Sequence, residues 1–293
     1  MLNLVAVLIV ICSVIGGFYL ANGPMHILLQ PIEFLIICGC AFGAFLLSNT
    51  PGIIIDTFKQ ASLFIKGNKY NKEYYTQSIM LLHDLKFIQN KSGNIELEKH
   101  LEDSAESHIF QNYPKILNDK YASQFVVDNL NMITSNNFEP HVIQQDIETE
   151  IKLHHKHQLE PSHALQSVAD AMPGLGIVAA VLGIINTMQY LDASNAEIGH
   201  HIGVALVGTF AGLYIAYGFL APCATKLKHI ADEEKNSLQV IQACLMAFVY
   251  NYKPDFAVEI ARKYIPPHAK PSVSELEDKI QESKDYFKNR NGG

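Results

Sequence analysis

Two uncharged stretches decide the fold: residues 171–191, AMPGLGIVAAVLGIINTMQYL, and residues 202–225, IGVALVGTFAGLYIAYGFLAPCAT. Neither stretch contains Asp, Glu, Lys, Arg or His. A helix needs about 20 predominantly apolar residues to cross the hydrocarbon core of a membrane. Both stretches are long enough, so the sequence predicts two successive transmembrane helices.

Small residues recur three or four positions apart in both stretches. They are Gly174, Gly176, Ala179, Ala180 and Gly183 in the first, and Gly203, Ala205, Gly208, Gly212, Ala216 and Gly218 in the second. In lipid, helices associate by close packing, and small residues mark the surfaces where they touch. The two stretches are therefore expected to pack closely on neighbouring helices.

Each stretch also contains one proline near its predicted cytoplasmic end, Pro173 and Pro222. Proline removes a backbone donor from a helix, so each marks a kink or pivot. The alternative interpretation is that membrane helices tolerate proline without a special role. Two prolines at matching depth in adjacent helices favour the first interpretation.

Two further apolar stretches precede this pair, at residues 1–21 and 33–50. A cleaved secretory signal is the alternative for the first, but that run is long and lacks a basic start. The connections at 22–31 and 192–201 contain no Lys or Arg, whereas lysines follow the second and fourth spans. The positive-inside rule therefore predicts that both termini are cytoplasmic.

The expected fold class is an all-α polytopic membrane protein with a large cytoplasmic helical domain between its second and third membrane helices. Of the 293 residues, 48% are hydrophobic and 17% are charged, and the hydrophobic residues form blocks. The expected segments are transmembrane helices at 1–21, 33–50, 171–191 and 202–225, a cytoplasmic domain at 51–169 and a cytoplasmic tail at 226–293.

Within the domain, Ile79, Leu82, Leu85 and Ile88 form an apolar stripe at helical spacing. A later helix is expected to start near Pro140 and to run towards the third span, interrupted or bent at Pro161. In the tail, Ser272 and Glu275 have the spacing of a capping box for a short polar helix.

No motif for catalysis is present, so the chain is not expected to be an enzyme or to need a cofactor. It lacks a phosphate-binding glycine loop, a nucleophile elbow and a His-Glu-x-x-His helix. The net charge of −7 argues against nucleic acid as a partner. A cluster at His154, His155, His157 and His163 permits a metal site, but a solvated, pH-sensitive face is the preferred interpretation and no metal is expected.

Few polar side chains lie within the third and fourth spans, among them Asn186, Thr187 and Thr209. Asp170 and Glu33 fall at the edges of their predicted spans. Proton and cation carriers keep a carboxylate at membrane depth. If this chain conducts ions, another chain is therefore expected to supply the acid.

The third and fourth spans closely resemble the MotA stator family of the bacterial flagellar motor. The likeness rests on DAMPGLGIVAAVLG at residues 170–183, VGTF at 207–210 and AYGFLAP at 216–222. It extends over nearly the whole chain, including FQNYPKIL at residues 110–117 and AVE at 257–259 in the tail.

This resemblance implies a ring of five such subunits around a dimer of MotB-like helices, whose membrane aspartate carries the ion. Pro173 and Pro222 match the family's two coupling prolines, and Thr209 matches a polar residue that lines the ion path. Ala180 stands where sodium-driven relatives have threonine, which indicates a proton-driven motor. The implied location is the inner membrane of the cell, and the implied role is torque generation in flagellar rotation and chemotaxis.

The resemblance also implies a cytoplasmic contact with the rotor protein FliG through opposite charges. Glu98 and Glu150 match the family's acidic positions. The paired arginine is replaced by Asn90, with Lys91 beside it, and lysine lacks the bidentate geometry of arginine. The alternative is that Glu98 and Lys91 are solvated surface charges.

Two other classes of protein are alternatives. A TolQ/ExbB-type energiser of an outer-membrane process shares the ion path but has three spans and an outside N-terminus. A membrane-anchored structural or sensor protein would need no ion flux, and Pro173, Thr209 and Pro222 argue against it.

Overall fold

A computed structural model describes residues 2–63, 69–135 and 139–290, and every regular element in these ranges is a helix. The chain divides into two compact units. Unit 1 comprises Met1–Gly67 and His157–Ile230, and unit 2 comprises Asn68–Lys156 and Ala231–Gly293. The all-α fold class expected from the sequence is confirmed.

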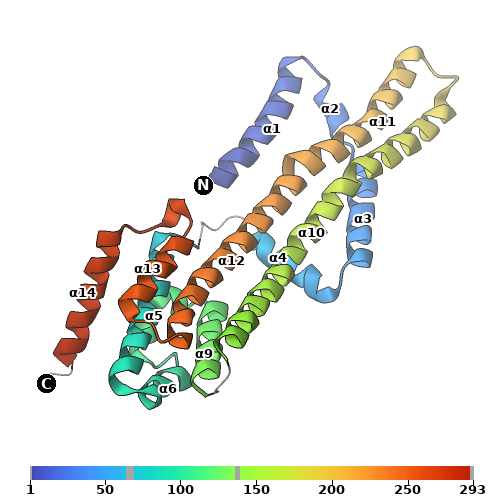
Figure 1. The fold of residues 1–293 in the computed structure, drawn as a ribbon. Coiled ribbons are helices and arrows are strands. Elements are labelled where there is room, and N and C mark those ends of the chain that lie inside the picture. The colour runs from blue at the N-terminus through green and yellow to red at the C-terminus, as the bar shows by residue number, and fades with distance from the viewer. Residues whose placement is uncertain (1, 64–68, 136–138, 291–293) are drawn as a thin grey trace. The chain divides into compact units, whose positions relative to one another are not determined.

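Unit 1 contains the apolar helices. They are α1 (Leu2–Leu20), α2 (Met25–Leu28), α3 (Pro31–Ser48), α4 (Pro51–Leu63), the later part of α10 (Pro140–Thr187), η1 (Met188–Tyr190), α11 (Asn195–Ile215), η2 (Ala216–Leu220) and the beginning of α12 (Ala221–Val249). In this unit α3, α10 and α11 lie side by side (Figure 1).

Four helical runs in the described residues are long and apolar enough to cross a membrane. They are Asn3–Leu20, Met25–Ser48, Pro140–Tyr190 and Asn195–Val249. The second run begins before residue 33, because the short helix α2 precedes α3. Glu33 therefore lies inside this run and not at its first residue.

Unit 2 contains shorter helices around one hydrophobic core. They are α5 (Lys72–Ser92), α6 (Asn94–Glu102), α7 (His108–Gln111), α8 (Pro114–Leu117), α9 (Lys120–Ser135), the first part of α10, the later part of α12, α13 (Pro254–Tyr264), η3 (Pro267–Ala269) and α14 (Val273–Arg290). The predicted stripe Ile79, Leu82, Leu85 and Ile88 is buried in this core, together with Phe110.

Local sequence signals explain where several of these helices begin. The Asn71 side chain accepts a hydrogen bond from the Tyr74 backbone N–H at 3.0 Å and caps α5. The predicted capping box is confirmed at the start of α14. The Ser272 N–H donates to Glu275 Oε2 at 2.7 Å, and the Glu275 N–H donates to Ser272 Oγ at 3.2 Å.

The helix α10 begins at Pro140, as predicted, and continues without interruption through Pro161 and Pro173. The expected interruption at Pro161 is absent from α10. A proline inside a helix costs one backbone hydrogen bond but does not have to end the helix when packing holds both sides. The elements α11, η2 and α12 likewise follow one another without a loop.

Candidate functional site

The helices α10 and α11 approach each other through four glycines, Gly176, Gly183, Gly208 and Gly212, which we call the glycine seam. A methyl group placed on Gly176 would lie 2.8 Å from the Gly208 carbonyl oxygen. One placed on Gly212 would lie 3.0 Å from the Cα of Gly176. The two backbones are therefore in direct contact, as the small-residue pattern predicted.

The two predicted ion-path residues lie beside this seam. Thr209 is half-buried, and its Cα would lie 3.3 Å from a methyl group on Gly176. Ala180 is buried, and its backbone nitrogen would lie 3.1 Å from a methyl group on Gly208. The fold thus brings Thr209 and Ala180 to one short section of the contact between α10 and α11.

Pro173 belongs to the same section of unit 1. The carbonyl oxygen of the preceding residue, Met172, would lie 2.7 Å from a methyl group on Gly212. A proline that removes a hydrogen bond from α10 is thus adjacent to one of the close backbone contacts with α11. Pro173 itself is half-buried.

Pro222 lies farther along the chain and is exposed. The five residues Ala216–Leu220 before it form a π-helical turn, which ends where the Ala221 backbone N–H donates to the Ala216 carbonyl. Pro222 has no N–H to continue the regular pattern. Turns of this kind interrupt α-helices and frequently occur at functional sites. The sequence predicted a kink or pivot at Pro222, which stays a prediction, and it did not predict the π-helical turn beside it.

A buried hydrogen bond joins α10 to α12 within unit 1. The Ser162 hydroxyl donates to the Ala224 carbonyl at 2.7 Å. Ala224 is two residues after Pro222, so this bond fixes the helix just beyond the π-helical turn. Sequence reasoning missed Ser162, because a serine in a helix most often bonds within its own helix.

Glu33 is the functional candidate that the sequence interpretation set aside. It is 6% exposed and points towards the glycine seam from α3. A sequence signal for the burial of Glu33 was available in the spacing of its neighbours on α3. Glu33 begins a stripe with Ile37, Ala41 and Phe45, which repeats every fourth residue and is buried.

Histidine and tyrosine rings gather at the end of unit 1 that precedes α11. His201 stacks on Tyr190 with ring centroids 4.1 Å apart, and His200 stacks on His26 at 6.0 Å. These groups come from α2, η1 and α11. They bring titratable side chains to the same end of the membrane helices.

The predicted rotor-contact residues all lie in unit 2. Asn90 and Lys91 are exposed in the last turn of α5, and Glu98 is half-buried on α6. Gly93, with φ of 84°, forms the turn between these two adjacent helices. The fold therefore places Asn90, Lys91 and Glu98 on one helix pair.

Glu150 differs from these three because it is engaged within its own unit. Its Oε2 accepts a hydrogen bond from Asn129 Nδ2 at 3.0 Å. Burial raises the pKa of the Glu150 carboxyl above its usual range, against the lowering effect of the Asn129 hydrogen bond.

The histidine cluster is divided among separate partners. His154 pairs with Glu234 at 3.0 Å and stacks on Tyr121, and His155 pairs with Asp232 at 3.3 Å. Burial lowers the pKa of His155. Across the described residues, no group of three or more His, Cys, Asp or Glu could hold a metal ion.

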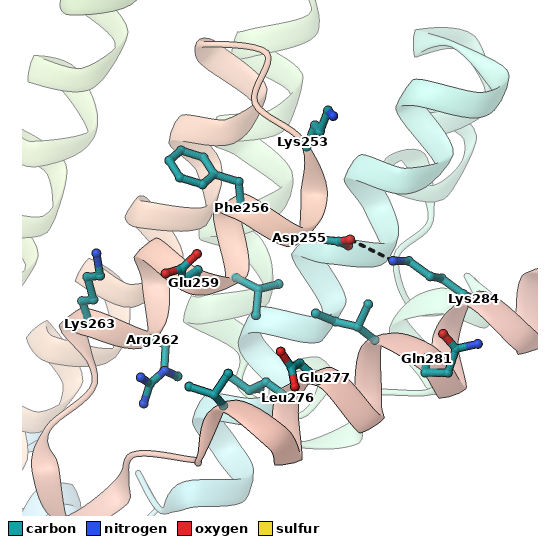
Figure 2. A pocket seen from close by; sticks show the side chains of 13 residues that line it. Lys253, Asp255, Phe256, Glu259, Arg262, Lys263, Leu276, Glu277, Gln281 and Lys284 are labelled. Atoms are coloured by element: carbon teal, nitrogen blue, oxygen red, sulfur yellow. Dashed lines mark hydrogen bonds and ion pairs between the residues drawn. The ribbon is translucent and has the colours of Figure 1, made fainter.

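A hollow of about 580 Å³ lies between α13 and α14 (Figure 2). The Asp255–Lys284 ion pair, at 2.8 Å, crosses from one helix to the other. The other charged residues that line the hollow are Lys253, Glu259, Arg262, Lys263 and Glu277. Because charged residues of both signs line the hollow, it favours neither an anionic nor a cationic ligand.

Comparison with known families gives two matches along the chain. Residues 4–93 match the family described as motility protein A N-terminal. Residues 117–240 match the MotA/TolQ/ExbB proton channel family. The second match includes the glycine seam, Pro173, Thr209 and Pro222.

Full-length relatives give the same result. The chain is 36% identical to motility protein A of Salmonella typhimurium over 281 residues, which cover 96% of this chain and 95% of the relative. It is 34% identical to chemotaxis protein LafT of Vibrio parahaemolyticus over 96% of this chain and 99% of the relative.

Solved structures share the fold. The structure of MotAB from C. jejuni matches with a TM-score of 0.75 at 19% identity, over 92% of this chain and 98% of the matched chain. The flagellar MotAB stator complex from Bacillus subtilis matches with a TM-score of 0.69 at 18% identity, over 91% of this chain and 97% of the matched chain. Sequence and fold agree, and the chain belongs to the motility protein A branch of the MotA/TolQ/ExbB proton channel family.

Proposed function

We propose that this chain is a stator subunit of a bacterial flagellar motor, which couples proton flow across the inner membrane to torque on the rotor. The observation that carries the proposal is the glycine seam, with Thr209 and Ala180 beside it and Pro173 in the same contact. This arrangement occurs in a chain that is 36% identical to motility protein A over almost its full length.

The glycine seam is suited to helix packing and helix movement rather than to an enzyme active site. Helices in backbone contact can slide or separate as rigid bodies, as a stator that steps against its partner requires. Ala180 in place of a hydroxyl side chain supports the proton as the driving ion.

The partner in this proposal is a MotB-like subunit that supplies a membrane aspartate. Five copies of this chain would surround a dimer of such subunits. The two solved structures with the same fold are both MotAB complexes, which supports a partner of this kind.

The proposed orientation has both termini and unit 2 in the cytoplasm. Lys59, Lys69 and Lys72 follow the second span, and Lys226 and Lys228 follow the π-helical turn. Lysines concentrate on the cytoplasmic side of membrane proteins, which supports this orientation in the inner membrane.

Contact with the rotor protein FliG would use Lys91 and Glu98, with Asn90 beside them. Exposed ion pairs contribute only about 0–1 kcal/mol each, so such a contact would steer and engage repeatedly. The Glu150 carboxyl is occupied by Asn129 and would contribute less directly.

The energy for each step would come from the membrane potential. One elementary charge crossing 100 mV supplies about 2.3 kcal/mol. That amount suits a small rigid-body shift of packed helices. Pro173 and the π-helical turn before Pro222 are two points in the membrane helices where backbone hydrogen bonding already departs from the regular pattern.

The test is to replace each proline by alanine. Pro173→Ala and Pro222→Ala should abolish motility while the protein stays in the membrane at its normal amount. Pro140→Ala is the matched control, because Pro140 is the first residue of α10, where a missing N–H costs no helical bond. Normal swimming by both variants would contradict the proposed coupling role.

A TolQ/ExbB-type energiser was the alternative, and the comparisons do not favour it. Both full-length relatives described above are motility or chemotaxis proteins. The chain also has four apolar runs among its described residues.

A further inference from the structure

Glu33 is a carboxyl group enclosed in the interior of unit 1. It lies in the first turn of α3 and begins the buried stripe that continues with Ile37, Ala41 and Phe45. Only 6% of the residue is exposed. The helix therefore directs a carboxyl group to the same face as its hydrophobic contacts.

The carboxyl group occupies space that two seam glycines leave open. A methyl group on Gly183 would lie 3.2 Å from Glu33 Oε1, and one on Gly208 would lie 2.9 Å from Glu33 Oε2. Side chains at these two positions would fill the pocket. The seam glycines thus serve two purposes, the contact between α10 and α11 and the room for Glu33.

This pocket lies well inside the apolar section of α10. Gly183 is 13 residues after Asp170 and nine residues before Asp192. At about 1.5 Å per residue, these separations are roughly 20 Å and roughly 13 Å. The carboxyl group is therefore at membrane depth, where the sequence had predicted none in this chain.

One oxygen of this carboxyl has no hydrogen-bond partner among the described residues. Glu33 Oε2 is fully buried and unbonded. An ionised carboxylate without a partner in an apolar site costs several kcal/mol or more, whereas the neutral acid has one donor and a much smaller penalty. The geometry is therefore that of a protonated carboxylic acid.

The two residues that approach the Glu33 carboxyl oxygens are Gly183 on α10 and Gly208 on α11. Neither carries a charge, and the residues beside them, Ala179, Ala180 and Ala205, are also uncharged. The titratable groups of the neighbouring elements lie farther along them: His157, Glu160, His163 and Asp170 on α10, Glu197, His200, His201 and Tyr214 on α11, His26 on α2, Cys38 and Cys40 on α3, and Tyr190 on η1.

We propose that Glu33 is a proton-binding site of this chain. Its carboxyl group takes up a proton from the outer side and holds it while the glycine seam is closed. When α10 and α11 move apart and water reaches the pocket, the O–H bond breaks and the proton passes to a water molecule, so that a carboxylate remains until the next uptake. The release step rests on the proposed stator function, but the binding of the proton does not.

Infrared difference spectroscopy tests the binding step directly. The full-length chain with its MotB-like partner would be placed in lipid vesicles and titrated with pH. A band from a buried protonated carboxylic acid is expected, and Glu33→Gln should remove its Glu33 component while Glu33→Asp keeps a carboxylic acid band. The control is Glu197→Gln, an exposed residue of α11. An unchanged band in Glu33→Gln would overturn the proposal.

Swimming speed tests the release step. Glu33→Gln preserves the shape of the side chain, so the protein should assemble, but swimming speed should at least halve and its dependence on external pH should change. Glu33→Asp should restore part of the speed. If Glu33→Gln swims like the parent at every pH, the release step is wrong. If the unsubstituted protein itself drives no rotation, the proposed function fails, while the infrared result still decides whether Glu33 binds a proton.

Discussion

The two units of this chain are packed by opposite means. Unit 2 has a core of large side chains, with Tyr74, Tyr75, Phe110 and Phe125 almost completely buried. Unit 1 has the glycine seam, where backbone lies directly on backbone. The first arrangement is sensitive to the removal of atoms, and the second is sensitive to their addition.

This difference follows from the surroundings of each unit. In water, burial of apolar side chains drives folding, so large residues contribute most to stability. In lipid this driving force between helices is absent, and close contact of small residues replaces it. A seam without interlocking side chains can also move as two rigid surfaces, which suits a site that must open and close.

The largest effect on stability is expected when side-chain atoms are removed from the core of unit 2. Phe110→Ala should lower the free energy of unfolding by about 3–5 kcal/mol, because Phe110 is fully buried and a cavity would remain. Thermal unfolding of the purified protein would measure this loss. The control is Phe256→Ala, since Phe256 is 49% exposed, and an equal loss in both variants would contradict the account of the core.

A methyl group added in the glycine seam should have the next largest effect on stability. Gly212→Ala would place a methyl group 2.7 Å from the Met172 carbonyl oxygen, so the two helices must separate, at a cost of about 1–3 kcal/mol. Loss of motility should accompany the lower unfolding temperature.

Gly174→Ala provides the matched control on α10, because nothing described lies within 4 Å of the added methyl group. Its unfolding temperature should stay equal or rise, since alanine favours a helix by about 1 kcal/mol over glycine. If Gly212→Ala behaved in the same way, backbone contact would not hold the two helices together.

A smaller effect is expected at the start of α14, where local stability depends on hydrogen bonds rather than on packing. Ser272→Ala removes the acceptor for the Glu275 N–H and should cost about 1 kcal/mol of local stability. Hydrogen exchange of α14 would measure the loss. Asp278→Ala is the control at an exposed position of the same helix, and equal exchange in the two variants would contradict the capping role.

The smallest effect is a pH dependence at the same position. Hydrogen bonds from Lys72 and Ser272 lower the pKa of Glu275 to about 2 from 4.5. Because this pKa is lowered in the folded state, the stabilisation is present above pH 4.5 and is lost as the pH falls towards 2. The protection of the α14 amides, relative to their intrinsic exchange rate at each pH, should therefore fall over this range, and less so in Glu275→Gln. An equal fall in both variants would contradict the assignment.

The membrane helices and their contacts could be predicted from sequence because their signals are local. Uninterrupted apolar length identifies the spans, and the spacing of small residues identifies the seam between α10 and α11. The capping box of α14 and the first turn of α10 at Pro140 could be predicted for the same reason.

The features that were missed depend on contacts between distant segments. Glu33 was assigned to the edge of a span because α2 was not predicted, and its pocket exists only when α3, α10 and α11 come together. The hydrogen bond from Ser162 to Ala224 and the π-helical turn at 216–220 also depend on the packed state. The roles of Asn90, Lys91, Glu98 and Glu150 need a partner chain and stay predictions.

The most direct test of a proton-driven stator is swimming speed in a strain that lacks its own stator. This chain would be expressed there with a MotB-like partner, sodium would be varied at fixed pH, and a protonophore would then be added. The account predicts a speed that is indifferent to sodium and is lost with the protonophore. A swimming speed that rises with the sodium concentration and persists in the presence of the protonophore would contradict the account.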